Sequence, residues 1–164
     1  MIFVTLGTQD KEFKRLVDII YKYLENSNSD EKIIIQYGNT KYDYDEFKAF
    51  KNVKCFDFIS PEDFEKYLNE ADFVITHAGV GTIINGLNHN KKLIVVPRLK
   101  KYKEHVNDHQ LQITENFAHE GYIIEYKEDD DLQDLIKKIK DFKPKKYESN
   151  NQRFNDELEK IINN

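Results

Sequence analysis

The sequence predicts a Rossmann-like α/β domain, a mostly parallel sheet with helices on both faces. Two observations predict it. Short apolar segments rich in β-branched and aromatic residues alternate along the chain with segments whose apolar residues recur at helical spacing. Several of the short segments are apolar at every position, which is typical of strands that are buried on both faces. In such a sheet, ligands bind at the carboxyl ends of the strands.

Six strands are expected from the short apolar segments, at Ile2–Leu6, Ile33–Tyr37, Val53–Phe58, Phe73–Thr76, Leu93–Val96 and Tyr122–Tyr126. Four helices are expected from apolar stripes at a period of about 3.6 residues. Their stripes are Phe13, Leu16, Val17, Ile20 and Leu24; Phe64, Tyr67, Leu68 and Ala71; Leu132, Leu135, Ile136, Ile139 and Phe142; and Phe154, Leu158, Ile161 and Ile162. Two further helices are expected to open after the fourth and fifth strands.

Helix boundaries are marked by residues with known capping preferences. Ser60 and Pro61 supply an N-cap followed by proline at the first helical position. Gly121 stands where a helix would close before the sixth strand. We expect one domain over residues 1–164, with its core in 1–142 and a C-terminal helix over 150–163. A domain of this size buries roughly 70% of its unfolded surface.

Composition excludes several classes of protein. The net charge of −5 argues against a general nucleic-acid-binding protein. No stretch reaches the ~20 apolar residues of a membrane span, and the first residues predict a strand and not a signal peptide. The single cysteine, Cys55, cannot form an internal disulfide, which fits a reducing compartment. We therefore expect a cytoplasmic protein.

Basic residues gather in one region of this acidic chain. They are Lys91, Lys92, Arg98, Lys100, Lys101 and Lys103. A solvated loop explains such a run as well as a positive field for phosphates does, whether of a nucleotide, a lipid diphosphate or a membrane surface.

Three predicted strand ends carry residues suited to chemistry. Gly7-Thr8-Gln9 follows the first strand, and His77-Ala78-Gly79-Val80-Gly81-Thr82 follows the fourth and opens a helix. Small residues let a ligand approach the free N–H groups of a helix N-terminus, where an anion such as a diphosphate is favoured. Glycines at these turns would also serve tight packing of strand on helix.

The third strand end, Glu104 to Gln110, is dense in hydrogen-bonding side chains. Groups that both donate and accept suit a polyhydroxylated ligand such as a sugar. Helix capping by Asn107 or Asp108 is the plainer alternative. Three such strand ends together favour a site.

Two metal-like patterns are interpreted as coincidental. His105 and His109 are four residues apart, but no glutamate or cysteine pair accompanies them in a zinc-site spacing. Asp43-Tyr44-Asp45 matches an Asp-x-Asp motif, which is a common match in a chain with 30 acidic residues. It lies away from the three strand ends. We expect no metal.

These segments resemble the donor-binding, C-terminal domain of glycosyltransferase family 28. The segments Ala71–Ile83, Lys91–Pro97 and Asn107–Gln110 carry the resemblance, and Ile2–Thr8 is similar to the start of free-standing members. Those members are the catalytic subunit of the eukaryotic dolichol-linked UDP-N-acetylglucosamine transferase and its bacterial relatives in capsule and exopolysaccharide synthesis. Arg98–Gln110 is most similar to the bacterial capsule type, whose best-known members are β-1,4-galactosyltransferases. The resemblance covers about Met1 to Tyr126.

The resemblance implies half of a split, inverting hexosyltransferase of the GT-B fold. It implies a UDP-sugar donor, UDP-galactose in the capsule type, and a polyprenyl-diphosphate-linked saccharide as acceptor. A membrane-anchored subunit would bind this acceptor and recruit the chain to the inner face of the membrane. The fold class handles its leaving diphosphate without a metal, so no cofactor is expected.

By position, the resemblance also implies roles for individual residues. Gly7, Thr8, Gln9, His77, Gly79, Gly81 and Thr82 would line the diphosphate, and the backbone of Ile59 would meet the uracil. Asn107, Asp108, His109 and Gln110 would meet the sugar. The family pattern Gly-Thr-x-x-Glu ends in a glutamate that grips the ribose, whereas this sequence has Asn85 in that position.

Two hypotheses about function follow. In the first, the chain is the donor-binding subunit of an enzyme, with His77 and His105 as candidates for the general base unless the partner supplies it. In the second, it is a non-catalytic Rossmann-like activator or nucleotide sensor, for which the missing glutamate is an argument.

Overall fold

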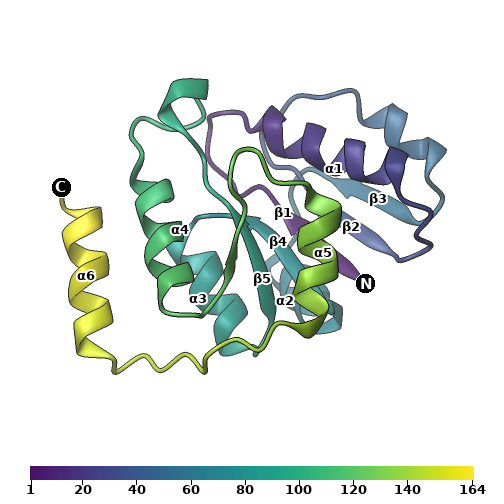
Figure 1. The fold of residues 1–164 in the computed structure, drawn as a ribbon. Helices are drawn as coiled ribbons and strands as arrows, with labels where there is room; N and C mark the ends of the chain where they lie inside the picture. Colours follow the sequence, from purple (N-terminus) through teal and green to yellow (C-terminus); the bar gives the residue numbers. More distant parts are fainter.

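Six strands form one parallel sheet in the computed structural model, which describes all of residues 1–164 (Figure 1). They are β1 (Ile2–Thr5), β2 (Ile33–Gln36), β3 (Val53–Phe56), β4 (Phe73–His77), β5 (Lys92–Val96) and β6 (Ile124–Glu125). Their order is β3-β2-β1-β4-β5-β6. The chain moves outward from β1 to β3 and then returns to the other side of β1 with β4. The loops after β1 and β4 therefore flank the point where strand order reverses, which is the usual ligand crevice of such sheets.

Helices cover both faces of the sheet. They are α1 (Lys14–Asn26), α2 (Pro61–Glu70), α3 (Val80–Asn88), α4 (His109–His119), α5 (Leu132–Asp141) and α6 (Gln152–Ile162), with 3₁₀ turns at Tyr44–Ala49 and Lys100–Tyr102. Side chains of α1 and α5 share one buried core with alternate residues of the strands. Those of α2, α3, α4 and α6 share a second core on the opposite face. The predicted fold class is confirmed.

The predicted strands are all found; β1, β2, β3 and β6 are shorter than predicted, and β4 and β5 are each one residue longer. The largest difference is in β6, where Tyr122 and Ile123 were expected to be part of the strand. The N–H of Tyr122 instead donates to the carbonyl of Phe117, and Gly121 has a φ of +83°. These residues therefore complete the end of α4, which leaves two residues to pair with β5.

The helix signals were read correctly, apart from one residue. Ser60 caps α2 by accepting from the N–H of Asp63, as its position predicted. In α6, Phe154 packs at 4.9 Å from Phe117, centroid to centroid, and Leu158 is also buried. Ile162 is wrongly placed in the stripe, since it is 49% exposed.

Figure 1 shows α6 beside α4 at one end of the molecule, where an extended segment after α5 carries the chain. None of the helices combines the length and apolarity required to traverse a bilayer.

Candidate functional site

A cavity of about 330 Å³ opens at the carboxyl ends of β1 and β4. It collects eight of the residues singled out in the sequence. These are Gly7, Thr8, Gln9, Ile59, His77, Gly79, Gly81 and Thr82. The three loops that carry them are far apart in the sequence, so the parallel topology brings them together. The sequence did not single out Thr5, Gln36, Phe58 and Phe64, which also line the cavity.

The floor of the cavity is a buried polar network. Thr5 Oγ1 donates to Gln36 Oε1 at 2.6 Å, and Gln36 Nε2 donates to the carbonyl of Asp57 at 2.9 Å. The second bond holds the loop that presents Phe58 and Ile59. A sequence signal for these residues existed, because Thr5 and Gln36 are the polar last residues of otherwise apolar strands.

The wall of the cavity on the β4 side is the start of α3. Gly79 is its N-cap and offers no side chain, so the N–H groups of Val80, Gly81 and Thr82 have no partner within the helix. A Cβ added at Gly81 would meet nothing within 4 Å. The first turn of α3 therefore presents free donors and the positive end of the helix dipole to open space.

His77 lies between the two glycine turns. It is 5% exposed, and a Cβ added at Gly7 would come within 2.4 Å of its Nε2. A Cβ at Gly79 would come within 2.6 Å of its Cε1. Both glycines are therefore needed so that the imidazole can fit. Burial, aided by the nearby Arg98 and His105, lowers the pKa of His77 to about 3.

Gln110 fixes His77 from behind. Its Oε1 accepts from the backbone N–H of Ala78 at 3.2 Å and of Arg98 at 3.0 Å, which sets the orientation of the amide. Its Nε2 then lies 3.5 Å from His77 Nδ1 and can only donate. The neutral imidazole therefore carries its proton on Nε2, the atom that a Cβ at Gly7 would approach.

Arg98 joins the loops after β1 and β5. It is 1% exposed, and it donates to the carbonyls of Leu6 at 2.8 Å, Lys11 at 2.7 Å and Glu104 at 3.2 Å. Glu104, also buried, accepts from Nε and Nη2 of Arg15 and from the N–H of Leu99. Burial lowers the pKa of Arg98 to about 10, against the opposing effect of Glu104.

The basic cluster is therefore not a free positive field. Arg98 is inside the protein, and Lys91 and Lys92 donate to backbone carbonyls of neighbouring elements. Lys101 pairs with Glu128 at 2.6 Å. The side chains of Lys100 and Lys103 have no such partners. The composition could not show this, because each partner comes from another part of the chain.

The four residues expected at the sugar do not line this cavity. Asn107 Oδ1 accepts from the N–H of His109, and Asp108 Oδ1 accepts from the N–H of Lys100. Gln110 is 3% exposed. Asp108 borders a neighbouring cavity of about 540 Å³ together with Arg15, Pro97 and Lys101.

Two other residues expected at the site also lie outside the cavity. His105 is half-buried and accepts from the N–H of Asn107 at 3.4 Å through Nδ1. Asn85 is half-buried one turn along α3 from Gly81, and its Nδ2 donates to Glu65 Oε1 at 2.9 Å.

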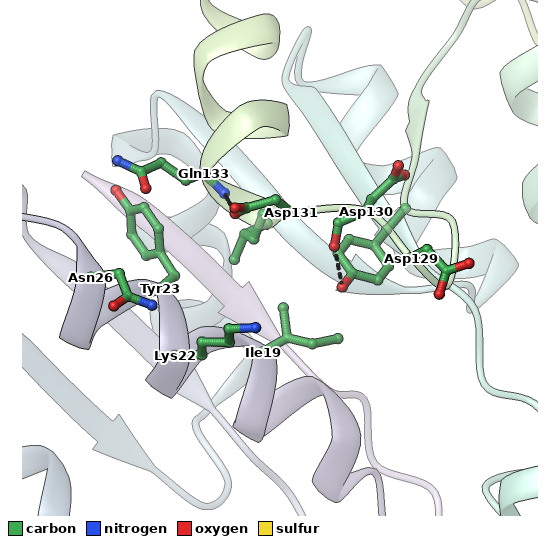
Figure 2. A pocket seen from close by; sticks show the side chains of 10 residues that line it. Ile19, Lys22, Tyr23, Asn26, Asp129, Asp130, Asp131 and Gln133 are labelled. Carbon is green, nitrogen blue, oxygen red and sulfur yellow. Dashed lines mark hydrogen bonds between the residues drawn. The ribbon is translucent and has the colours of Figure 1, made fainter.

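The acidic motifs serve local structure. Asp43 caps the 3₁₀ turn by accepting from the N–H of Asp45. Figure 2 shows the acidic loop before α5, where Asp131 accepts from the N–H of Gln133 and the carbonyl of Asp130 accepts from Tyr126. No three His, Cys, Asp or Glu side chains converge in the arrangement that a metal would need.

Comparison with known proteins identifies the family to which the chain belongs. The model of the glycosyltransferase family 28 C-terminal domain matches residues 1–164. The chain is 30% identical over 118 residues, 71% of its length, to UDP-N-acetylglucosamine transferase subunit ALG13 of Candida albicans. It is 30% identical over 135 residues, 80% of its length, to the protein of that name from Debaryomyces hansenii.

These matches cover 36% and 57% of the two relatives, so the chain spans only about a third to somewhat more than half of their length. Neither relative is a capsule galactosyltransferase by name. An NMR solution structure of ALG13 is similar in fold, with a TM-score of 0.61 and 23% identity over 99% of this chain and 96% of that one.

Proposed function

The chain belongs to the glycosyltransferase family 28 C-terminal domain family, and on this premise we propose that it is the donor-binding subunit of a glycosyltransferase that uses a UDP-sugar. The observation that carries the proposal is the cavity between the Gly7 turn and the N-terminus of α3. It offers free N–H donors and a neutral imidazole at one point, with apolar side chains a short distance away.

The diphosphate is proposed to bind where the two glycine turns face each other. There the N–H groups of Gly81 and Thr82 and the Nε2–H of His77 would donate to its oxygens, with Gly7, Thr8 and Gln9 on the opposite wall. Because these donors are fixed before the ligand arrives, they can stabilise the charge that develops on the leaving UDP without a metal.

The uracil ring of the donor is proposed to occupy the part of the cavity formed by Phe58, Ile59 and Phe64. The hydrogen bond from Gln36 Nε2 to the carbonyl of Asp57 holds this loop in place, so the backbone of Ile59 is available to the uracil. The ring of Phe58 is 51% exposed, so it can cover a nucleobase.

The sugar is proposed to project from the diphosphate toward the loop of Asn107, Asp108 and His109. Of the four residues expected there, Gln110 is the poorest candidate for direct contact, because its amide is buried and its oxygen is committed to two N–H groups. Its role is better described as holding His77.

UDP-N-acetylglucosamine is the donor that we propose first, because both curated relatives are named for that sugar. UDP-galactose, the donor implied by the resemblance of Arg98–Gln110 to the capsule type, is the competing donor. The acceptor is proposed to be a saccharide linked to a polyprenyl diphosphate.

In the reaction, a hydroxyl oxygen of the acceptor attacks the anomeric carbon of the donor. The bond from that carbon to the β-phosphate oxygen breaks, UDP leaves with the electron pair, and the configuration inverts. The proton of the hydroxyl passes to a general base. A pKa near 3 makes His77 a weak base at neutral pH, so its neutral ring is proposed to donate from Nε2 to the diphosphate instead. We therefore propose that the base comes from His105 or from the acceptor-binding partner.

The partner is proposed to be a membrane-anchored subunit that holds the acceptor. The relatives are themselves named as subunits, which supports a second chain in the complex. The chain would then work in the cytoplasm, at the inner face of the membrane, through this partner.

The test is transfer of radiolabelled sugar from UDP-N-acetylglucosamine and from UDP-galactose to a polyprenyl-diphosphate-linked saccharide. Purified chain is assayed alone and with membranes that contain its partner. Transfer only in the combined reaction supports the proposal, and the preferred donor identifies the sugar. Binding of UDP without transfer in any reaction would favour a nucleotide-binding activator instead. Full activity of the isolated chain would contradict a split enzyme.

A further inference from the structure

A carboxylate joins α2 and α3 beside the cavity. Glu65 Oε1 accepts from Asn85 Nδ2 at 2.9 Å, and Glu65 Oε2 lies 2.8 Å from His89 Nε2. His89 is fixed in turn, since its Nδ1 is 2.8 Å from the carbonyl of Asn85. The carboxylate therefore has a defined position, set from α3 by two side chains.

The position of Glu65 is close to two cavity-lining segments. It follows Phe64 on α2, and Phe64 lines the cavity. Its partner Asn85 is one helical turn beyond Gly81, which lines the cavity from α3. Residues four apart lie on the same side of a helix. Asn85 therefore lies on the same side of α3 as Gly81, and Glu65 meets it from α2 next to the cavity, although neither side chain lines the cavity.

The carboxylate keeps capacity for further hydrogen bonds. The Glu65 side chain is 45% exposed, so water or a ligand can reach it. Each carboxylate oxygen accepts about two hydrogen bonds, and each has one neighbour here. A pair of hydroxyls would fit this arrangement, because both groups would donate to a group that only accepts.

The covalent structure of a UDP-sugar indicates which part of the ligand would lie beside Glu65. In a UDP-sugar the ribose connects the base to the diphosphate. The proposed base position is at Ile59, just before α2, and the proposed diphosphate position is at Gly81, in the first turn of α3. The ribose would therefore cross between the start of α2 and the start of α3, about one helical turn from the contact of Glu65 with Asn85.

We propose that Glu65 recognises the ribose of the donor, accepting hydrogen bonds from its hydroxyls while Asn85 and His89 hold the carboxylate. The inference rests on the proposed function, and it assigns to this site a preference for ribonucleotides over deoxyribonucleotides. In this proposal Asn85 on α3 positions the carboxylate, and Glu65 on the neighbouring helix α2 contacts the ribose.

A purely structural role for Glu65, tying α2 to α3, predicts different behaviour. Loss of such a tie would change the binding of every nucleotide that uses the cavity to the same degree. Loss of ribose recognition would instead weaken UDP more than a nucleotide that lacks one of the two hydroxyls. The ratio of two affinities in one variant therefore separates the two roles.

The experiment is calorimetric titration of the full chain with UDP and with 2′-deoxy-UDP. The natural chain should bind UDP about tenfold more tightly, the usual size of a hydrogen bond to a charged group. Glu65→Gln, which keeps the shape of the side chain, should bind the two nucleotides with similar affinity. Glu70→Gln is the matched control, since it removes an exposed carboxylate from the other end of α2 and should keep the natural ratio.

Two results would overturn the inference while leaving the proposed function in place. One is a Glu65→Gln variant that still prefers UDP by the natural ratio. The other is a variant that weakens both nucleotides equally, as a structural tie would. Failure of the natural chain to bind UDP would reject the nucleotide site itself, and the role of Glu65 with it.

Discussion

Nε2 of Gln110 lies 3.5 Å from Nδ1 of His77, in a position where it can only donate. The contact directs the proton-bearing nitrogen of His77 toward the glycine turns. It also keeps a neutral imidazole beside the proposed diphosphate site, because burial opposes a second proton on the ring. A residue expected at the sugar thus supports the proposed diphosphate site.

Binding of UDP should stabilise the folded chain. At a free concentration one hundred times its dissociation constant, UDP should add about 2.7 kcal/mol to the free energy of unfolding. For a domain of this size, that is a rise in Tm of roughly 5–11 °C by thermal denaturation. The rise should persist in EDTA, because the proposed donors are N–H groups. Equal protection by ADP would reject the assignment of uracil to the Ile59 loop.

Gly81 and Gly79 should respond differently to an added side chain. Gly81→Val should fold with an unfolding free energy within about 1 kcal/mol of the natural chain, because the space around its Cβ is open. It should nevertheless lose UDP affinity by at least about tenfold, since the valine would occupy the ligand's position. Gly79→Val should destabilise the fold, because its Cβ would collide with His77. Circular dichroism with calorimetry measures both, and a Gly81 variant that binds UDP normally would place the diphosphate elsewhere.

Arg98 should be important for stability although it is a charged residue. Arg98→Leu would remove the donor that the backbone carbonyls of Leu6, Lys11 and Glu104 share. The expected loss is about 3 kcal/mol or more, since unpaired buried polar groups cost about 1–3 kcal/mol each. Lys100→Ala, at an exposed neighbouring position, should change stability by less than about 0.5 kcal/mol. Urea denaturation of both variants tests this, and equal effects would mean that the buried bonds contribute nothing.

Acid should destabilise the protein through His77. Its pKa is lowered in the folded state to about 3, so above the ordinary histidine value it is neutral in both states and contributes nothing. As the pH falls below about 6.5, only the unfolded chain takes up the proton, so stability falls by up to about 1.4 kcal/mol per pH unit. His77→Gln should flatten the dependence of unfolding free energy on pH between about 6.5 and 4.5. His119→Gln, at an exposed position, is the control and should not change how the unfolding free energy depends on pH. If His77→Gln also left this dependence unchanged, the imidazole of His77 would be solvated and not buried.

A carboxylate at position 85 should repel Glu65. Asn85→Glu replaces a 2.9 Å donor contact with a second negative charge, which at this half-exposed site should cost about 0.5–1 kcal/mol of stability. Adding Glu65→Gln should recover that loss, because the amide and the carboxylate have then exchanged places. Thermal denaturation of the two single variants and the double variant measures the coupling. Additive effects would mean that the two side chains do not interact in solution.

The sequence was most informative where structure is local. Glycine turns after apolar strands and the cap at Ser60 depend on neighbours within a few residues, and the structure has them where they were expected. The interior position of Arg98 and the contact of Glu65 with Asn85 could not be predicted in this way. Asn85 is 20 residues from Glu65 and Leu6 is 92 residues from Arg98, and only the packing of the sheet brings each pair together.

The position of β1 in the middle of the sheet has a consequence for folding. Although it comes first in the sequence, it is completed only when β4 pairs with it, Ile2 opposite Phe73. At about 5–20 residues per second, a ribosome needs roughly 4–14 s to add the intervening segment. During that time one edge of a very apolar strand has no partner, which exposes the nascent chain to aggregation. This topology therefore predicts that chaperones bind the first forty or so residues of the nascent chain during synthesis.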